Sequence, residues 1–360
     1  MLHRWAADLA HLPLLSGAVP TATLTVAAVL LLATIGSVVV RVRRGSGSGA
    51  VFGSLSVLAL LAAVLVAAAV LTNLTVTRYP TVALALGHRP AVPVEGHGRL
   101  VDREVPGFAS HFDARPATIY LPASYDAGAD DLPVLVLLTG QPGHVVDWIE
   151  GGHLLQTMDA FAARHEGAAP IVVVADGLGD TEANPMCMDS NLGNAATYLS
   201  VDVPQWVRSN FRASADPRAW AVGGYSYGGT CALRLAVTAP SVFPTFLDIS
   251  GEDEQRRGTR AESVAAAFGA DTPANEERFE RVTPLNMLSH HSFPDSAGAF
   301  VAGSDDEEFR PQTEHAFEAA AGAGLDVHYS ELPGGHSMQV WAPALEQEMD
   351  WLGGRLGLLD

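Results

Sequence analysis

The chain has 360 residues, enough for one large catalytic domain plus a smaller element, because single hydrophobic cores stop growing near about 300 residues. It carries 21 basic and 40 acidic residues, a formal net charge of −19 at pH 7. Residues 81–360 hold 16 of the arginines and 39 of the acids, a net charge of −23, which argues against binding to nucleic acid or to anionic lipid surfaces.

Two long apolar runs come first in the chain, at residues 18–40 and 50–76, and neither contains a charged residue. About 20 apolar residues are enough for a helix to cross a bilayer. A cleaved signal peptide has a shorter apolar core that follows a basic start. We therefore expect a membrane anchor with two transmembrane helices in residues 1–80.

The short loop between the two runs contains Arg41, Arg43 and Arg44 and no acid. Basic short loops remain in the cytoplasm, so the chain after residue 76 should lie outside the cell membrane. Residues 81–98 are rich in Pro, Gly and Ala and are interpreted as a linker. Residues 99–360 are then the folded, extracytoplasmic domain of a multi-pass membrane protein.

Strand-like and helix-like segments alternate through this domain, which predicts a mainly parallel sheet with helices on both faces. The strand-like segments are short, apolar or β-branched, and mostly end in glycine, proline or a polar turn. They are residues 117–122, 132–140, 170–177, 218–224, 245–251, 297–303 and 326–332. Longer segments with apolar residues at helical spacing lie between them, at 153–167, 197–211 and 311–324.

The two cysteines both lie in the predicted extracytoplasmic domain. An oxidising compartment permits disulfides, so we expect a bond between Cys187, in the loop "NPMCMDS", and Cys231, in the helix after Ser226. The loop follows a strand that should neighbour the strand before Ser226. Two unpaired buried thiols are the alternative.

The segment "WAVGGYSYGGTCAL" places Ser226 between a buried strand and a helix, within the pattern Gly-x-Ser-x-Gly. This pattern is typical of a serine nucleophile on a sharp turn, where a Cβ in place of either glycine would collide with the neighbouring strand or helix. An ordinary glycine-rich loop is the alternative, but the strand before and the helix after favour a nucleophile. Acyl chemistry also needs an oxyanion hole, and the expected donors are the backbone N–H groups of Tyr227 and Gln141.

A base and an acid should follow the serine in the chain. His336, in "ELPGGHSMQVW", follows the last strand on a glycine turn and is the expected base. The acid should leave the strand at 297–303, and its spacing from Gly303 selects Asp306. Asp305, Glu308 and Glu314 remain alternatives.

Six segments together resemble a known family: "LLTGQPG", "VVVADG", "DVPQWV", "WAVGGYSYGGTCALRLA", "FLDISGE" and "LPGGHSMQVW". They are similar to the Putative esterase branch of the α/β-hydrolases, which includes esterase D, feruloyl esterases and mycolyltransferases. The likeness is greatest to membrane-anchored esterase-like proteins of actinobacteria. It implies an α/β-hydrolase fold over roughly residues 100–355 and a serine hydrolase or acyltransferase without a metal or organic cofactor. The sequence departs from the mycolyltransferases at the acid, which they take from a helix further along.

The predicted function is therefore a membrane-anchored serine esterase or acyltransferase that uses Ser226, His336 and Asp306. Its substrate would be an acyl ester, such as an envelope lipid, and no obligate protein partner is evident. Membrane anchoring also leaves aminoacyl-phospholipid hydrolysis open. The alternative from a different class is a non-catalytic binding or structural module of the envelope.

Overall fold

The computed structural model describes residues 97–359, together with the helical residues 25, 29, 61 and 64–68. Residues 1–91 and 92–360 are two separate units. Among the residues described, we find no helix with both the length and the apolar character needed to cross a membrane. The predicted spans 18–40 and 50–76 and the linker 81–98 lie almost wholly outside these residues.

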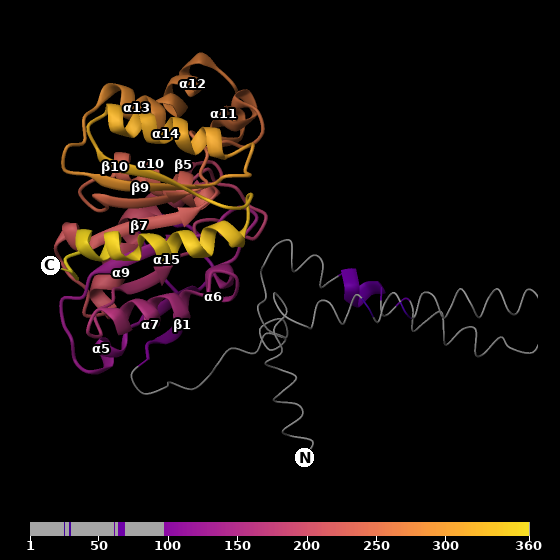
Figure 1. Ribbon diagram of the computed structural model, residues 1–360. Coiled ribbons are helices and arrows are strands. Elements are labelled where there is room, and N and C mark those ends of the chain that lie inside the picture. Colours follow the sequence, from indigo (N-terminus) through magenta and orange to yellow (C-terminus); the bar gives the residue numbers. More distant parts are fainter. Residues whose placement is uncertain (1–24, 26–28, 30–60, 62–63, 69–96, 360) are drawn as a thin grey trace, which may run out of the picture. The chain divides into compact units, whose positions relative to one another are not determined.

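An eight-stranded sheet forms the centre of the second unit (Figure 1). Its strand order is β1-β2-β4-β3-β7-β8-β9-β10. The strand β2 runs antiparallel to both of its neighbours, and the strands from β4 to β10 in this order are mutually parallel. The strands are β1 (Arg99–Arg103), β2 (Ala117–Leu121), β3 (Val134–Leu138), β4 (Ile171–Val174), β7 (Trp220–Tyr225), β8 (Thr245–Ile249), β9 (Ala297–Gly303) and β10 (Asp326–Leu332). The predicted mainly parallel sheet is confirmed, and β1 is an edge strand that the sequence did not indicate.

Helices cover both faces of the sheet because the central strands are apolar on both sides. In β3, Val134, Val136 and Leu138 face one hydrophobic cluster, whereas Leu135 and Leu137 face the other. The first cluster packs against α9, α10, α13 and α14, and the second against α6, α7 and α15. The helices are α5 (Ala123–Asp126), α6 (Val146–Glu150), α7 (Leu154–Arg164), α8 (Ala195–Thr197), η1 (Tyr198–Asp202), α9 (Val203–Asn210), η2 (Pro217–Ala219), α10 (Tyr227–Thr238), α11 (Arg260–Phe268), α12 (Pro273–Glu280), α13 (Pro284–His290), α14 (Arg310–Gly322) and α15 (Met338–Arg355).

The connection from β8 to β9 contains three short helices, α11, α12 and α13, which the sequence did not indicate. Thr259 and Glu262 form a capping box at the start of α11, so this helix begins where its free N–H groups find acceptors. A third apolar cluster, which includes Phe279, joins α11 and α12 to the loop around Met186 and Met188. That loop ends in the hairpin of β5 (Asp189–Ser190) and β6 (Gly193–Asn194).

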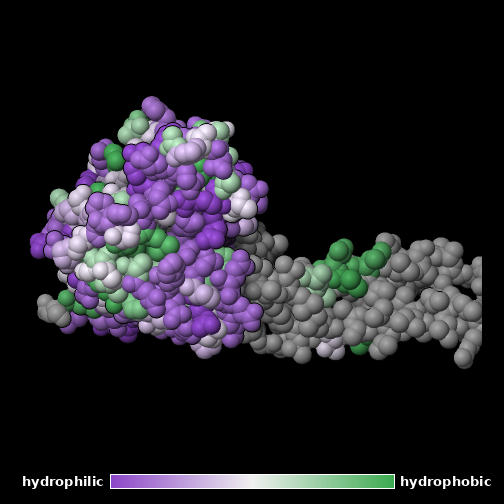
Figure 2. Space-filling model, turned by 90° about the horizontal axis from the view of Figure 1, so that it is seen from above, coloured by the Kyte–Doolittle hydropathy of each residue, from purple (hydrophilic) through white to green (hydrophobic). Residues whose placement is uncertain are grey.

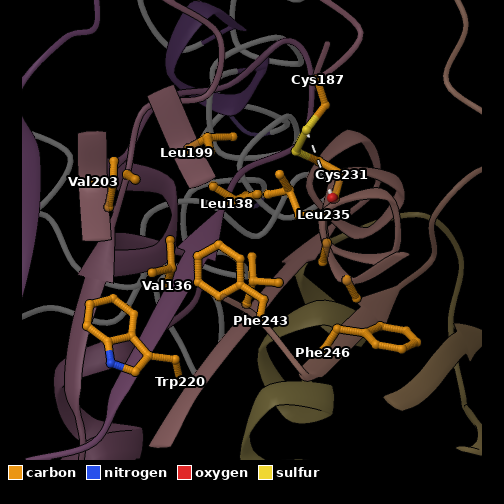
Figure 3. Packing of buried hydrophobic residues seen from close by; sticks show 14 of the residues in the cluster. Val136, Leu138, Cys187, Leu199, Val203, Trp220, Cys231, Leu235, Phe243 and Phe246 are labelled. Carbon is orange, nitrogen blue, oxygen red and sulfur yellow. Dashed lines mark hydrogen bonds between the residues drawn. A yellow bond between two sulfur atoms is a disulfide. The ribbon is translucent and has the colours of Figure 1, made fainter. Parts of the chain in front are cut away.

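A disulfide joins Cys187 to Cys231, as predicted from the sequence (Figure 3). Their Cα atoms are 5.5 Å apart, and 44 positions separate the two cysteines in the chain. Both cysteines are buried. The bond therefore fixes the loop before β5 to the helix that follows Ser226.

The surface of this unit is mostly hydrophilic on the face shown in Figure 2. Among residues 97–359, Phe108 is the one large hydrophobic side chain that is strongly exposed, at 81%. Apolar side chains are therefore concentrated in the clusters beside the sheet, and the acidic residues counted in the sequence lie mainly at the surface.

Candidate active site

Ser226 lies on a sharp turn between β7 and α10. Its backbone has φ 55° and ψ −124°, a strained conformation for a residue with a side chain. The turn is held by hydrogen bonds: the Ser226 N–H donates to the Ile249 carbonyl at 2.8 Å, and the Ser226 carbonyl accepts from the Gly229 N–H at 2.9 Å. The side chain of Ser226 is thereby lifted above the end of the sheet.

The glycines on either side of Ser226 allow this turn because no side chain fits in their place. A Cβ on Gly224 would lie 2.5 Å from the carbonyl carbon of Gly228 and 2.7 Å from the carbonyl oxygen of Leu138. A Cβ on Gly228 would lie 2.5 Å from the same Leu138 oxygen. Strand β7, helix α10 and strand β3 therefore meet too closely for any residue larger than glycine, as the Gly-x-Ser-x-Gly pattern predicted.

His336 reaches Ser226 from the loop between β10 and α15. Its Nε2 lies 2.9 Å from Ser226 Oγ, and its Nδ1 lies 2.7 Å from Asp306 Oδ2. The three side chains thus form a continuous hydrogen-bonded chain, although Ser226 and His336 are 110 residues apart. This is the spatial relation that a serine nucleophile, a base and an orienting acid require.

Asp306 is the acid that contacts His336. It is only 4% exposed, and its Oδ1 accepts a second hydrogen bond, from the Phe309 N–H at 3.0 Å. The alternative acids Asp305, Glu308 and Glu314 are exposed to solvent. The loop therefore turns one of its acids inward, and the structure brings Asp306 rather than the other three to the histidine.

Burial lowers the pKa of His336, and the neighbouring Asp306 opposes this shift. Burial disfavours the charged imidazolium, and it is the larger of the two effects on the pKa. A neutral imidazole at neutral pH can accept a proton from Ser226, as a general base must.

Two aromatic rings, which no sequence pattern had linked to the site, pack against His336. Phe309 stacks on the imidazole with ring centroids 3.8 Å apart and an interplanar angle of 21°. Trp341 meets it nearly at a right angle, with centroids 4.9 Å apart, and stacks in turn on Tyr225. The Phe309 contact arises because the loops after β9 and β10 converge, so no local pattern could have revealed it.

A pocket of about 420 Å³ opens beside Ser226. Most of its lining residues are polar or charged: Gln141, Glu182, Asn184, Ser226, Tyr227, Glu252, Arg256, Arg257, Gly258 and Phe309. Gln141 and Tyr227, the predicted oxyanion donors, both line this pocket together with Ser226. The loop after β3 approaches Ser226 closely: a Cβ on Gly140 would lie 3.3 Å from Ser226 Cβ.

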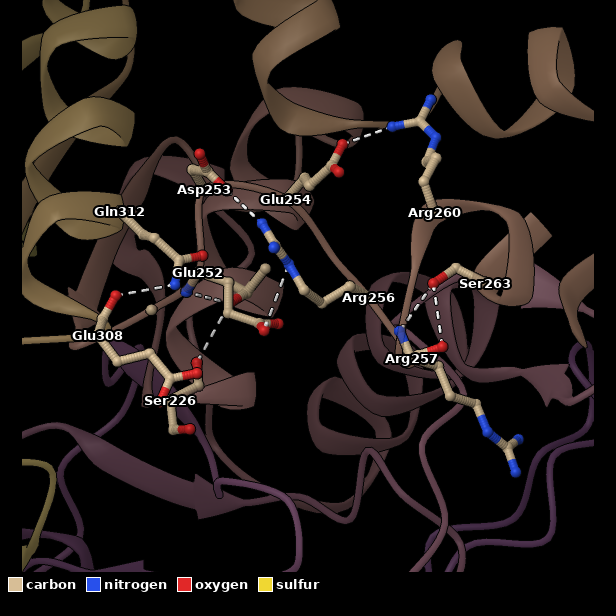
Figure 4. A network of polar contacts seen from close by, with 12 residues as sticks. Ser226, Glu252, Asp253, Glu254, Arg256, Arg257, Arg260, Ser263, Glu308 and Gln312 are labelled. Atoms are coloured by element: carbon tan, nitrogen blue, oxygen red, sulfur yellow. Dashed lines mark hydrogen bonds and ion pairs between the residues drawn. The ribbon is translucent and has the colours of Figure 1, made fainter.

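The pocket wall formed by residues 252–258 is highly charged (Figure 4). Arg256 pairs with Glu252 at 3.5 Å and with Asp253 at 2.7 Å. Burial raises the pKa of Glu252 to about 7. The Glu252 N–H donates to Thr230 Oγ1, which donates in turn to the Ser226 carbonyl, so this wall is linked to the nucleophile turn.

Tyr227 connects the start of α10 to the disulfide. Its hydroxyl accepts the Cys187 N–H at 2.8 Å and donates to the Gly177 carbonyl at 3.2 Å. As the first residue of α10, it also has a backbone N–H with no acceptor inside the helix. The residue predicted to supply an oxyanion donor is therefore held by both its side chain and the nucleophile turn.

The chain is similar to a protein family, to a relative by sequence and to several solved structures. The family model described as Putative esterase matches residues 113–352. An uncharacterized protein of Corynebacterium glutamicum is 41% identical over 256 residues, which cover 69% of this chain and 59% of that protein's length.

Solved structures share the fold at low sequence identity. A ferulic acid esterase has a TM-score of 0.61 and 18% identity, over 72% of this chain and 99% of that one. An S-formylglutathione hydrolase from Agrobacterium tumefaciens has a TM-score of 0.59 and 17% identity, over 74% and 98%. MPT51 (FbpC1) of Mycobacterium tuberculosis has a TM-score of 0.53 and 17% identity, over 73% and 99%. These likenesses establish an α/β-hydrolase-like fold.

Proposed function

The chain belongs to the Putative esterase family and is a carboxylester hydrolase or acyltransferase, and within that class we propose a membrane-anchored serine enzyme whose catalytic domain lies outside the cytoplasm. Ser226 is the nucleophile, His336 the general base and acid, and Asp306 the residue that orients the histidine. The observation that carries this proposal is the unbroken hydrogen-bonded chain from Asp306 through His336 to Ser226.

The reaction begins when Ser226 Oγ attacks the ester carbonyl carbon and His336 Nε2 takes the hydroxyl proton. Asp306 accepts the Nδ1 proton in a hydrogen bond, which keeps Nε2 free to act as the base and stabilises the imidazolium. Collapse of the tetrahedral intermediate breaks the ester bond, and the leaving alcohol receives the proton from Nε2. The acyl group is then bonded to Ser226.

The negative oxygen of the intermediate is stabilised by the backbone N–H groups of Tyr227 and Gln141. Support for this assignment comes from the N–H at the start of α10, which has no acceptor inside the helix, and from the close approach of the loop after β3 to Ser226. The helix terminus adds a favourable field for negative charge.

Acyl transfer from Ser226 to water gives hydrolysis, and transfer to an alcohol gives an acyltransferase. His336 serves either acceptor in the same way, by removing its proton as it attacks the acyl-serine. The polar pocket beside Ser226 is suited to the alcohol part of the ester or to an acceptor hydroxyl. An acyl ester of the cell envelope is the substrate class that agrees with a membrane-anchored enzyme.

The proposed location rests on two observations. The loop between the two apolar runs carries Arg41, Arg43 and Arg44 and no acid, which favours a cytoplasmic loop with both flanking segments outside. The Cys187–Cys231 disulfide supports the same orientation, since disulfides persist in oxidising compartments.

The direct test compares the full-length chain with its Ser226→Ala variant. The wild type should hydrolyse p-nitrophenyl butyrate and be labelled by a fluorophosphonate probe, and the variant should lose labelling and about 10⁴-fold or more in kcat. A variant with near-wild-type turnover would exclude Ser226 as the nucleophile. A folded wild type that neither turns over esters nor reacts with the probe would favour the non-catalytic alternative.

A further inference from the structure

Phe309 lines the pocket and contacts both His336 and Asp306, the first through its ring and the second through its backbone N–H. It follows Asp306 by three residues and precedes α14. Its ring stacks on His336, its backbone N–H donates to Asp306 Oδ1, and it lines the pocket beside Ser226.

The stack constrains the orientation of the imidazole. Both functional nitrogens of His336 lie in the ring plane, so tilting the ring would lengthen the contacts at 2.7 and 2.9 Å together. With Phe309 lying nearly parallel at 3.8 Å and Trp341 packed at a steep angle, such a tilt would require the neighbouring rings to move. The position is therefore set by packing as well as by hydrogen bonds.

The stacked ring of Phe309 also affects the stability of the charged form of His336. His336 becomes an imidazolium when it takes the proton from Ser226, and a cation over an aromatic face is attracted by the ring quadrupole. Asp306 is the carboxylate that hydrogen bonds to this imidazole, and its other oxygen is held by the Phe309 backbone. The aromatic face thus favours the protonated form at the moment when it develops.

We propose that Phe309 is a positioning residue, which holds His336 in line with Ser226 and Asp306 and stabilises its protonated form during acyl transfer. The proposal rests on the serine mechanism given above. It differs from a role as a pocket wall, in which Phe309 would contact the substrate and influence mainly KM.

The test uses two substitutions at this position in the full-length chain. Phe309→Leu keeps an apolar side chain and the backbone N–H but removes the aromatic face, whereas Phe309→Tyr keeps the face. We expect Phe309→Leu to lower kcat about tenfold, with KM changed less than threefold, and to move the acid limb of kcat/KM to lower pH by about half a unit. Phe309→Tyr should stay within twofold of the wild type with an unmoved acid limb.

Phe317→Leu is the matched control. Phe317 lies on α14, the helix that follows Phe309, and packs on Phe300 and Tyr329 rather than on His336, so its substitution tests removal of a nearby aromatic ring. It should leave kcat and the pH profile unchanged. Circular dichroism and thermal unfolding of each variant identify any that fails to fold.

Three results would overturn the proposal: a folded Phe309→Leu variant with unchanged kcat, a loss confined to KM with an unmoved acid limb, or an equal loss in Phe309→Tyr. Ser226→Ala, assayed in parallel, separates this failure from that of the mechanism. If Ser226→Ala is inactive while Phe309→Leu is normal, only the inference about Phe309 fails. If Ser226→Ala is as active as the wild type, the serine mechanism itself fails.

Discussion

Replacing Asp306 by asparagine should abolish most of the activity through a change of tautomer. Asp306 Oδ1 accepts the Phe309 N–H, and Oδ2 contacts His336 Nδ1. Asparagine has one acceptor oxygen and one amide group that only donates. Since the Phe309 N–H needs an acceptor, the amide group of asparagine would face Nδ1. His336 would then carry its proton on Nε2, and that nitrogen could not accept the proton of Ser226.

The expected fall in kcat follows from this loss of the base. The same substitution lowers kcat about 10⁴-fold in serine proteases, which corresponds to about 5.5 kcal/mol in the activation free energy. Asparagine matches the volume of aspartate, so the buried site should still be filled and the fold kept. The expected loss is therefore catalytic, with little change in the thermal midpoint of unfolding.

The assay is the steady-state hydrolysis of p-nitrophenyl butyrate by the full-length chain, with thermal unfolding followed by circular dichroism. Asp305→Asn is the matched control, because Asp305 is a neighbouring but exposed aspartate, and it should retain activity within about twofold. A folded Asp306→Asn variant within tenfold of the wild type would refute the tautomer argument. A greater loss in Asp305→Asn would move the acid to that residue.

Three further predictions concern the disulfide, pH and topology. Replacing Cys187 and Cys231 by alanine opens a loop of 44 positions and should lower the free energy of unfolding by about 4 kcal/mol, seen as a lower urea midpoint; an unchanged midpoint would contradict this. Because burial lowers the pKa of His336, the acid limb of kcat/KM should have its midpoint below the usual 6.5, and a midpoint above 6.5 would oppose it. The unfolded chain binds this proton more readily, so the His336 contribution should also reduce stability as pH falls below 6.5. Alkaline phosphatase fused after Asp360 should be active, whereas activity of a reporter that works only in the cytoplasm would reverse the proposed topology.

Local patterns predicted the core of the sheet because its strands are continuous apolar runs that end in turn residues. The edge strand β1 escaped prediction, since Arg99–Arg103 contains three charged residues and reads as a polar loop. Helix α12 was also missed. Phe279 is its one buried residue, so its sequence has almost no apolar face.

In the candidate site, too, local patterns predicted some residues and not others. Ser226, His336 and Asp306 could be selected because each lies at a fixed distance from a strand end, and the structure brings these three together. Phe309 could not, because its contact with His336 depends on how the loops after β9 and β10 approach each other in space. Trp341 lies in the first turn of α15, close to His336 in the chain, and its contact depends on how that helix begins. The charged wall at residues 252–258 depends likewise on the unpredicted connection between β8 and β9.

The three proposed catalytic residues and the charged pocket wall come from different connections of the sheet. Ser226, Asp306 and His336 follow β7, β9 and β10, whereas the charged pocket wall belongs to the connection after β8, which supplies none of the three. Mutations in that connection can therefore alter which ester is accepted while the hydrogen-bonded chain stays intact. For laboratory evolution of new specificities, the pocket-lining side chains of Arg256 and Arg257 are therefore positions to vary, because neither belongs to the hydrogen-bonded chain.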